Sequence, residues 1–185
     1  MYLLLHSEMV ASLREQGSEQ AEAKLRSTGF ATGLRLITRL TASKIPITTE
    51  RMVMKFVCKE LWTYLFNKPA SRLQVDKQGR YLIQDHAFRW LQSFPVLSAD
   101  APRSVNSTAS QEASVLSELQ ELTALHLALP CGVLQGALFG LGLERRVAAD
   151  ATLPSVTFTV AQATPSMASG ADAGAAAPSE ASLNL

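Results

Sequence analysis

The stretch VMKFVCKELWTYLFNKPASRLQVDKQGRYLIQD, residues 53–85, decides the fold. Its first half repeats apolar side chains at helical spacing and ends at Pro69, which cannot continue a helix. Its second half alternates apolar and polar residues on either side of a turn at residues 76–79, which is typical of a β-hairpin. The stretch shows no nucleophile-base pair, metal-ligand spacing or phosphate-binding loop. It therefore predicts a structural scaffold without catalytic residues.

The helix in this stretch is expected to begin at Thr48, whose hydroxyl is suited to accept a free amide of the first turn. Lys55 and Lys59 are expected to face water, one turn apart, and Trp62 to lie beside the apolar stripe, where it is open to contact with a partner. The residues expected to point inward are Val53, Phe56, Val57, Leu61, Tyr64 and Leu65.

Two helices are predicted before this stretch, at residues 3–14 and 19–40, with a break at Gly17 and Ser18. The apolar stripe of the second consists of Leu25, Phe30, Gly33, Leu34, Ile37 and Leu40. Glycine in a helix interior is less favourable than alanine by about 1 kcal/mol. Gly29 and Gly33, four residues apart, therefore indicate that another backbone packs closely against this helix.

After the hairpin, Phe88, Trp90, Leu91 and Phe94 are expected to pack onto the sheet or the base of the helices. The polar residues 98–114 predict a flexible loop insertion. A long helix at about residues 115–141, kinked or restarted near Pro130, is then followed by strands at residues 145–149 and 155–160. One domain, residues 1–161, is therefore expected, with a disordered tail rich in Ala, Ser, Gly and Pro at residues 162–185.

Residues 122–143 carry no acidic or basic side chain and are long enough to span a bilayer, which takes about 20 residues. They contain His126, Pro130 and Gln135, however, and polar groups are unfavourable at mid-membrane. A buried core helix is the favoured interpretation. Its glycines Gly132, Gly136 and Gly140 are spaced by four, so they predict a smooth stripe against which a neighbouring element packs closely.

Composition argues against several classes of function. The net charge is +1 and the basic residues are scattered, which argues against nucleic acid as a partner. His6, His86 and His126 are far apart with no ligand-like spacing, so neither a metal site, a cofactor site nor catalytic residues are expected. Cys58 and Cys131 lack a C-x-x-C neighbour and fit reduced, buried thiols of a cytosolic protein, although a disulfide between them stays open. The N-terminus has no basic region and too short an apolar run for a signal peptide.

Five segments resemble one known family. Residues 28–37, TGFATGLRLI, resemble the "GF/Y-x-x-G-x-R-L" helix of the small core subunits of the TRAPP complex. Residues 5–10, LHSEMV, residues 55–62, KFVCKELW, and residues 78–85, QGRYLIQD, resemble its subunit-six branch. Residues 131–138, CGVLQGAL, resemble the late helix of the wider Bet-three-like family. The segments follow the order of that family.

The resemblance implies an α+β fold, with helices packed on one side of a small antiparallel sheet. It implies a non-catalytic assembly subunit of the TRAPP tethering complex, which exchanges guanine nucleotide on a Rab GTPase in ER-to-Golgi and Golgi traffic. The partners implied are a Bet-three-like subunit, in a heterodimer, and the other core subunits. The location implied is cytoplasmic, peripheral to the Golgi and ER-Golgi membranes, and only through the complex. Residues 44–48, KIPIT, lack the acylated cysteine of the Bet-three branch, so acylation is not expected here.

Two non-enzymatic functions follow as hypotheses. For an assembly subunit, the candidate partner interface on the first two helices consists of Leu5, Met9, Leu13, Leu36 and Leu40, each of which fits the domain's own core equally well. The alternative is a small soluble protein that binds an apolar ligand such as a lipid, with the late helix and the hairpin as cavity walls. The glycine stripes argue against this alternative, because they indicate close packing. An enzyme is the least favoured interpretation, since no two reactive groups are placed together.

Overall fold

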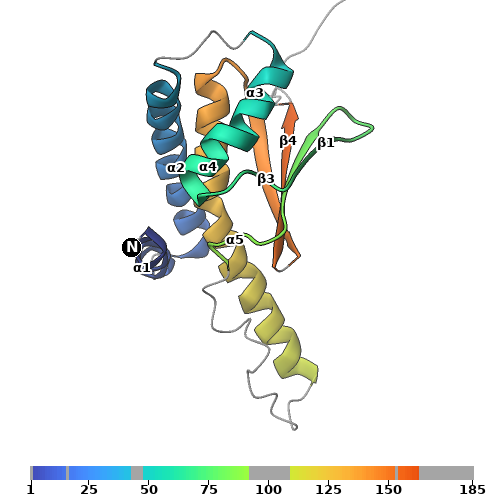
Figure 1. Ribbon diagram of the computed structural model, residues 1–185. Helices are drawn as coiled ribbons and strands as arrows, with labels where there is room; N and C mark the ends of the chain where they lie inside the picture. The colour runs from blue at the N-terminus through green and yellow to red at the C-terminus, as the bar shows by residue number, and fades with distance from the viewer. Residues whose placement is uncertain (1, 16, 43–47, 92–108, 153, 163–185) are drawn as a thin grey trace, which may run out of the picture.

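The computed structural model describes residues 2–15, 17–42, 48–91, 109–152 and 154–162. Its helices pack on one side of a four-stranded antiparallel sheet with the strand order β1-β2-β4-β3 (Figure 1), so the expected α+β fold is confirmed. The elements in chain order are α1 (Tyr2–Arg14), α2 (Ser18–Thr41), α3 (Glu50–Phe56), the π-helical turn η1 (Val57–Leu61), α4 (Trp62–Phe66), β1 (Arg72–Val75), β2 (Tyr81–Asp85), α5 (Ala109–Gly140), β3 (Arg145–Thr152) and β4 (Ser155–Gln162).

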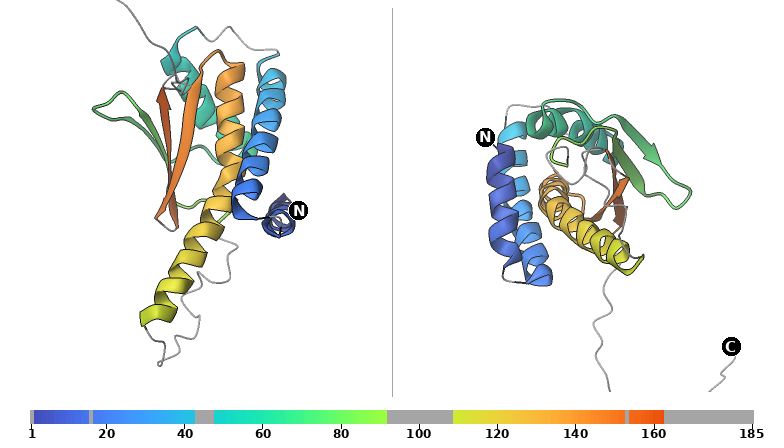
Figure 2. Two further views of the ribbon diagram at one scale, coloured as in Figure 1. Left: turned by 180° about the vertical axis from the view of Figure 1, so that it is seen from behind. Right: turned by 90° about the horizontal axis from the view of Figure 1, so that it is seen from below.

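Helices α2 and α5 pack closely against each other and run side by side in the left view of Figure 2. A Cβ atom added at Gly33 would lie 2.0 Å from the carbonyl oxygen of Val133, and one at Gly136 would lie 2.1 Å from that of Phe30. Gly29 and Gly132 are equally tight against the facing backbone. The close approach predicted from both glycine patterns is therefore confirmed, and the two patterns face each other.

Helix α5 is a core helix. Its segment Ser117–Gly140 is long and apolar enough to cross a membrane by length and composition, but 67% of its most apolar window is buried inside the protein. It continues through Pro130 as one helix, so of the two predicted alternatives, a kink or a restart, the restart is wrong. It also begins at Ala109, which places residues 109–114 in a helix where a polar loop was expected. The loop residues 98–108, the tail residues 163–185, residues 43–47 and Phe94 lie outside the described residues.

A π-helical turn interrupts the helix of residues 50–66 and explains two wrong predictions. A π-turn contains one residue more than an α-turn, so every later side chain is rotated around the helix. Trp62 is consequently 0% exposed, where contact with a partner was expected, and Tyr64 is 60% exposed, where burial was expected. The carbonyl of Cys58 within this turn accepts a hydrogen bond from the backbone of Ala70 at 2.9 Å, which places the start of β1 beside η1.

The start of this helix differs from the prediction by one residue. Thr49 and not Thr48 is the N-cap, since the Thr49 hydroxyl accepts a hydrogen bond from the Met52 amide at 3.3 Å. The remaining inward residues behave as predicted: Val53, Val57 and Leu61 are buried, and Phe56 and Leu65 pack partly buried against the core.

The sheet aligns apolar side chains on its helix-facing side. Leu73 of β1 pairs with Ile83 of β2, and Ile83 pairs with Phe158 of β4. The alternation predicted for β4 is confirmed, because Val156, Phe158 and Val160 are each at most 1% exposed. Phe158 in turn contacts Trp62 of α4, with ring centroids 5.4 Å apart, so the sheet and the helices share one core.

Candidate functional site

Helix α1 lies across the N-terminal part of α2 and against α5 (Figure 2). Its anchor is Val10, which is 1% exposed and belongs to a small apolar cluster with Ala21 and Leu25 of α2 and with Leu125 of α5. Arg14, at its C-terminal end, forms an ion pair with Glu118 of α5 at 2.7 Å. One face of α1 is therefore fixed to the domain, and the other is available for a partner.

The structure places the five predicted interface residues in two groups. Leu5 is 68% exposed on α1, and Met9 and Leu13 pack partly buried against the Val10 cluster. Leu36 and Leu40 pack partly buried against the main core instead. At a rise of about 1.5 Å per residue, Leu36 lies roughly 27 Å along α2 from Ser18, where α1 is joined. The five residues therefore do not form one compact patch.

The most exposed apolar side chain of this region was not predicted. Leu4, which precedes Leu5 on α1, is 74% exposed. The available signal was the run of leucines at residues 3–5, because three consecutive apolar residues on a helix cannot all face one core. Leu4 and Leu5 together are the clearest unpaired apolar surface on α1.

A buried pair of histidines ties α1 to the rest of the protein. The ring of His6 lies 4.5 Å from the ring of Trp90 and 4.9 Å from that of His126, which belongs to α5. Burial lowers the pKa of His6 to about 4, and both of its ring nitrogens are buried without a hydrogen-bond partner among the described residues. Burial lowers the pKa of His126 to about 4 as well, and the charge of His6 adds to that effect. Both rings are therefore neutral at physiological pH and serve as packing groups.

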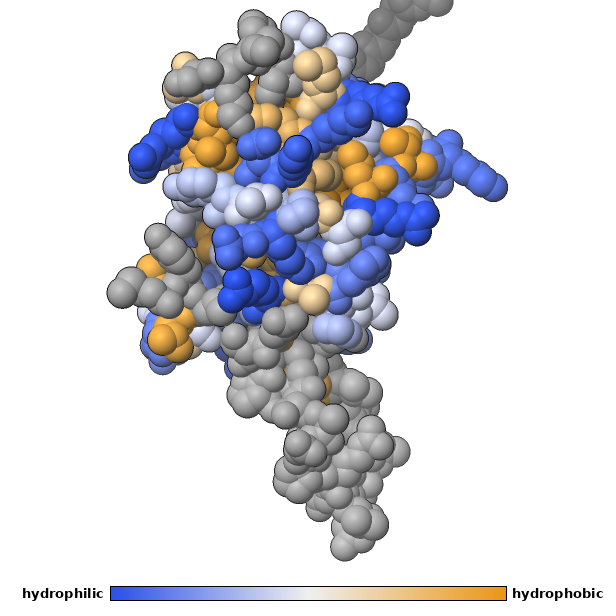
Figure 3. Space-filling view, viewed as in Figure 1, coloured by the Kyte–Doolittle hydropathy of each residue, from blue (hydrophilic) through white to orange (hydrophobic). Residues whose placement is uncertain are grey.

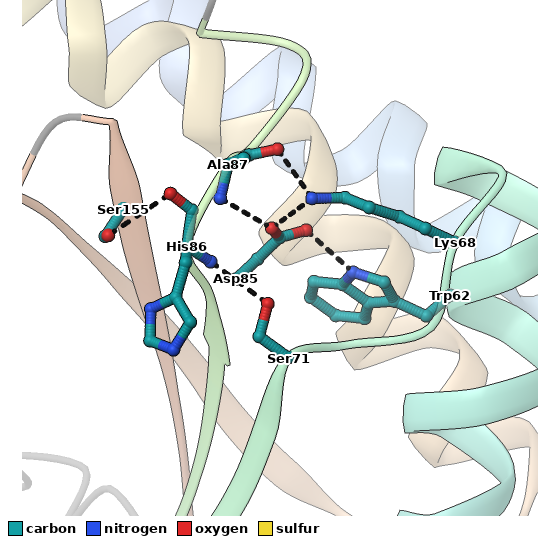
Figure 4. A network of polar contacts seen from close by, with 7 residues as sticks. All are labelled: Trp62, Lys68, Ser71, Asp85, His86, Ala87 and Ser155. Carbon is teal, nitrogen blue, oxygen red and sulfur yellow. Dashed lines mark hydrogen bonds and ion pairs between the residues drawn. The ribbon is translucent and has the colours of Figure 1, made fainter.

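Asp85 is the centre of a buried polar network (Figure 4). Its carboxylate is 0% exposed and accepts hydrogen bonds from the Trp62 indole at 3.1 Å and from the Ala87 amide at 3.0 Å. Lys68 forms an ion pair with the same carboxylate and also donates to the Ala87 carbonyl at 2.6 Å. Three donors satisfy the carboxylate, so Asp85 joins the helix of Trp62 to the end of β2 and is not free to react.

The two cysteines are free thiols, and neither is activated. Burial raises the pKa of the Cys58 thiol to about 12, and burial is likewise the main reason that the pKa of Cys131 is about 12. A nucleophilic cysteine requires a lowered pKa. Within the described ranges, no group of three or more His, Cys, Asp or Glu side chains is placed to hold a metal ion. His86 lies exposed in a turn.

Comparison with known proteins agrees with this architecture. A crystal structure of a trafficking protein particle complex subunit 3 from Naegleria fowleri, covalently bound to palmitic acid, superposes on the chain with a TM-score of 0.61. The superposition covers 87% of this chain and 93% of that one at 12% identity, a likeness that concerns the fold alone. The fold is thus that of the small subunits of this complex.

Sequence comparison defines the family. The family model for the transport protein particle (TRAPP) component matches residues 2–164. The chain is 33% identical over 168 residues to trafficking protein particle complex subunit 6B of Mus musculus, and 34% identical over 168 residues to subunit 6A of Homo sapiens. Each alignment covers 86% of this chain and 94% of the relative. The chain belongs to the TRAPP component family, and to its subunit-six branch.

Proposed function

We propose that the chain is a non-catalytic assembly subunit of the TRAPP tethering complex and that it pairs with a Bet-three-like subunit. The observation that carries this proposal is the 33% identity over 168 residues to subunit 6B, which extends over 94% of that protein. Within the complex, the subunit supports guanine-nucleotide exchange on a Rab GTPase in ER-to-Golgi and Golgi transport. It works in the cytoplasm and reaches the membrane only as a part of the assembled complex.

The exposed leucines of α1 support pairing through the first helices. Leu4 and Leu5 are 74% and 68% exposed, on a helix whose opposite face is fixed by Val10 and His6. A stable interface buries about 1,600 Å² in total, or roughly 800 Å² on each partner. We assign Leu4 and Leu5 to its centre, with Met9 and Leu13 continuing it along α1. Leu36 and Leu40 contribute to this interface if the partner also packs along α2.

The buried polar groups support a structural role. Asp85 has its carboxylate saturated by hydrogen bonds, and His6 and His126 are neutral and packed against each other. The thiols of Cys58 and Cys131 have pKa values far above neutrality. A catalytic acid, base or nucleophile requires a pKa near the working pH and a reachable substrate. We therefore assign the exchange activity to the assembled complex and not to residues of this chain alone.

Co-expression with the Bet-three-like subunit of the same organism, followed by light scattering on a sizing column, tests the pairing. The Leu5→Asp substitution is expected to abolish the heterodimer and leave the circular dichroism spectrum unchanged, because Leu5 is exposed. Tyr64→Asp is the matched control, since Tyr64 is 60% exposed on a different helix. Loss of pairing in both variants, or in neither, would contradict the assignment of the interface to α1.

The Met9→Asp substitution separates interface from core on the same helix. Met9 is partly buried against the Val10 cluster, next to the exposed leucines. We expect this variant to lose pairing and to keep its fold. If it unfolds instead, Met9 belongs to the domain core, and the interface is restricted to the exposed end of α1.

A second candidate function is the binding of a small apolar ligand. One observation favours it: the structural neighbour from Naegleria fowleri is covalently bound to palmitic acid. Covalent attachment is disfavoured here, because Cys58 and Cys131 both have a pKa of about 12, and residues 44–48 contain no cysteine. Native mass spectrometry of the purified chain decides between the functions, since a lipid carrier retains a bound lipid and an assembly subunit has the mass of the protein alone.

A further inference from the structure

A groove of about 770 Å³ lies between the helix α3–η1 and the hairpin β1–β2, away from α1. Its helical wall carries Arg51, Lys55 and Lys59, and its floor is formed by Leu73, Val75 and Tyr81 of the hairpin. Figure 3 shows hydrophobic surface over the hairpin, right of centre, bordered by hydrophilic side chains. The groove thus combines an apolar floor with a basic rim.

The floor exists because the sheet extends beyond the helices that cover it. Leu73 pairs with Ile83 and Val75 pairs with Tyr81, so these side chains share the helix-facing side of the sheet. Ile83 is 0% exposed under the helices, whereas Val75 is 59% exposed. The hairpin projects away from the helical layer in both views of Figure 2. The same apolar side that forms the core therefore continues into solvent along the hairpin.

The rim of the groove is positively charged. Arg51, Lys55 and Lys59 all line the groove from its helical side, and all three are exposed. In the part of the chain that the structure describes, none of the three takes part in an ion pair. Glu50 and Asp76 are engaged with other cations, Glu50 with Arg145 and Asp76 with Arg80, and Glu60, the residue after Lys59, does not line the groove.

We propose that this groove docks a segment of a partner protein in which apolar side chains are flanked by Asp or Glu. The apolar side chains pack on Leu73, Val75 and Tyr81, and the carboxylates face the three cations. Strand β1 borders the groove and is an edge strand of the sheet, and no other described strand pairs with its outer side, so it offers backbone groups to an extended peptide. This surface lies apart from the α1 interface and so admits a second partner.

A protein segment fits the groove better than an anionic membrane does. Membrane-binding basic clusters hold about four to eight Lys or Arg residues on a surface that lies flat on the lipid. Among the described residues, three cations line the helical side of the groove, and the side formed by the hairpin is apolar. A strand edge offers hydrogen bonds to a peptide backbone, whereas a lipid headgroup has no repeating amide donors and acceptors to match it. The charge, the shape and the open strand edge therefore favour a protein segment as the occupant of the groove.

Selection of a random dodecapeptide library on the full-length protein tests the proposal. Enriched peptides are expected to combine Asp or Glu with Leu, Ile, Val or aromatic residues. Their affinity, measured by fluorescence anisotropy, is expected to fall about tenfold or more in the Lys55→Glu, Lys59→Glu double variant. It is expected to fall similarly in Val75→Asp. Arg146→Glu is the matched control, because Arg146 is an exposed cation on β3, at the far edge of the sheet, and is expected to bind as the unchanged protein does.

Four outcomes would overturn the proposal. Enriched peptides without an excess of Asp or Glu would show that the three cations do not select the partner. A loss of affinity in Arg146→Glu as large as that in the double variant would show non-specific attraction to positive charge. Unchanged affinity in Val75→Asp, with its circular dichroism spectrum intact, would place the peptides outside the groove. Binding of the protein to vesicles with 30% phosphatidylserine, lost in the double variant and unmatched by any peptide, would identify a membrane as the occupant.

Discussion

The substitution Gly136→Ala tests the close backbone contact between α2 and α5. The added Cβ would lie 2.1 Å from the carbonyl oxygen of Phe30 on α2, and ordinary contact begins at 3.4 Å. The helices α2 and α5 must therefore separate by about 1.3 Å, the difference between these two distances. The obstacle is backbone and not the end of a side chain, so no rotamer change relieves it.

The size of the effect follows from two opposing contributions. Alanine is favoured over glycine in a helix interior by about 1 kcal/mol. Overpacking a well-packed site destabilises by about 1–3 kcal/mol, and the upper end applies here because the whole helix pair has to move. We expect a net loss of about 2 kcal/mol in the free energy of unfolding. For a protein of this size, that loss lowers the melting temperature by roughly 4–8 °C.

Urea denaturation followed by circular dichroism measures this loss, with Gly140→Ala as the matched control on the same helix. A Cβ at Gly140 meets side-chain carbons, at 2.6 Å from Cγ2 of Ile37 and 3.0 Å from Cδ1 of Leu34, which can shift. The control is expected to lose less stability. Gly33→Ala and Gly136→Ala are expected to be less than additive when combined, because both separate the same two helices. A Gly136→Ala protein as stable as the original would refute the reasoning.

Three further predictions concern the buried polar groups. The free energy of unfolding is expected to fall as the pH is lowered from about 6.5 towards about 4. In this range His6 and His126 become protonated in the unfolded chain but stay neutral in the folded protein, because their folded pKa is about 4. Urea titrations at several pH values measure this dependence, which is expected to be weaker in His126→Gln. Asp85→Ala is expected to lower the free energy of unfolding by about 2–4 kcal/mol, because it leaves the buried Trp62 indole N–H without an acceptor and takes the carboxylate from Lys68, which is 30% exposed. A loss under about 1 kcal/mol would contradict that network. Cys58 and Cys131 are expected to react with a disulfide reagent about a thousandfold more slowly in the native protein than in urea, because their pKa is about 12 against an ordinary 9.0; a rapid reaction of one thiol at neutral pH would disprove the burial.

The periodicity of apolar residues predicted the structure correctly wherever a pattern of side chains has one structural explanation. The alternation in β4 predicted its buried side, and the hairpin turn at residues 76–79 was placed correctly. The glycines spaced by four on α2 and α5 predicted close backbone contact, although the sequence did not show that the two stripes face each other. These features depend on residues that are near one another in the chain.

The errors arose where distant residues decide the local structure. The π-turn at η1 is held partly by the bond from Ala70 to the Cys58 carbonyl, and Ala70 comes after the helix has ended. Without that turn, simple helical spacing places Tyr64 inside and Trp62 outside. The contact between His6 and His126 joins α1 to α5, helices that are far apart in the sequence, and so leaves no local signal. The basic groove was missed because it depends on where the helices stop covering the sheet.

The most direct test of the central claim is the molar mass of the chain co-expressed with the Bet-three-like subunit of its own organism. Light scattering on a sizing column is expected to show a one-to-one heterodimer, and Leu5→Asp is expected to return it to two separate proteins. A well-folded monomer that does not bind that subunit would contradict the assignment of the chain as an assembly subunit that pairs through α1.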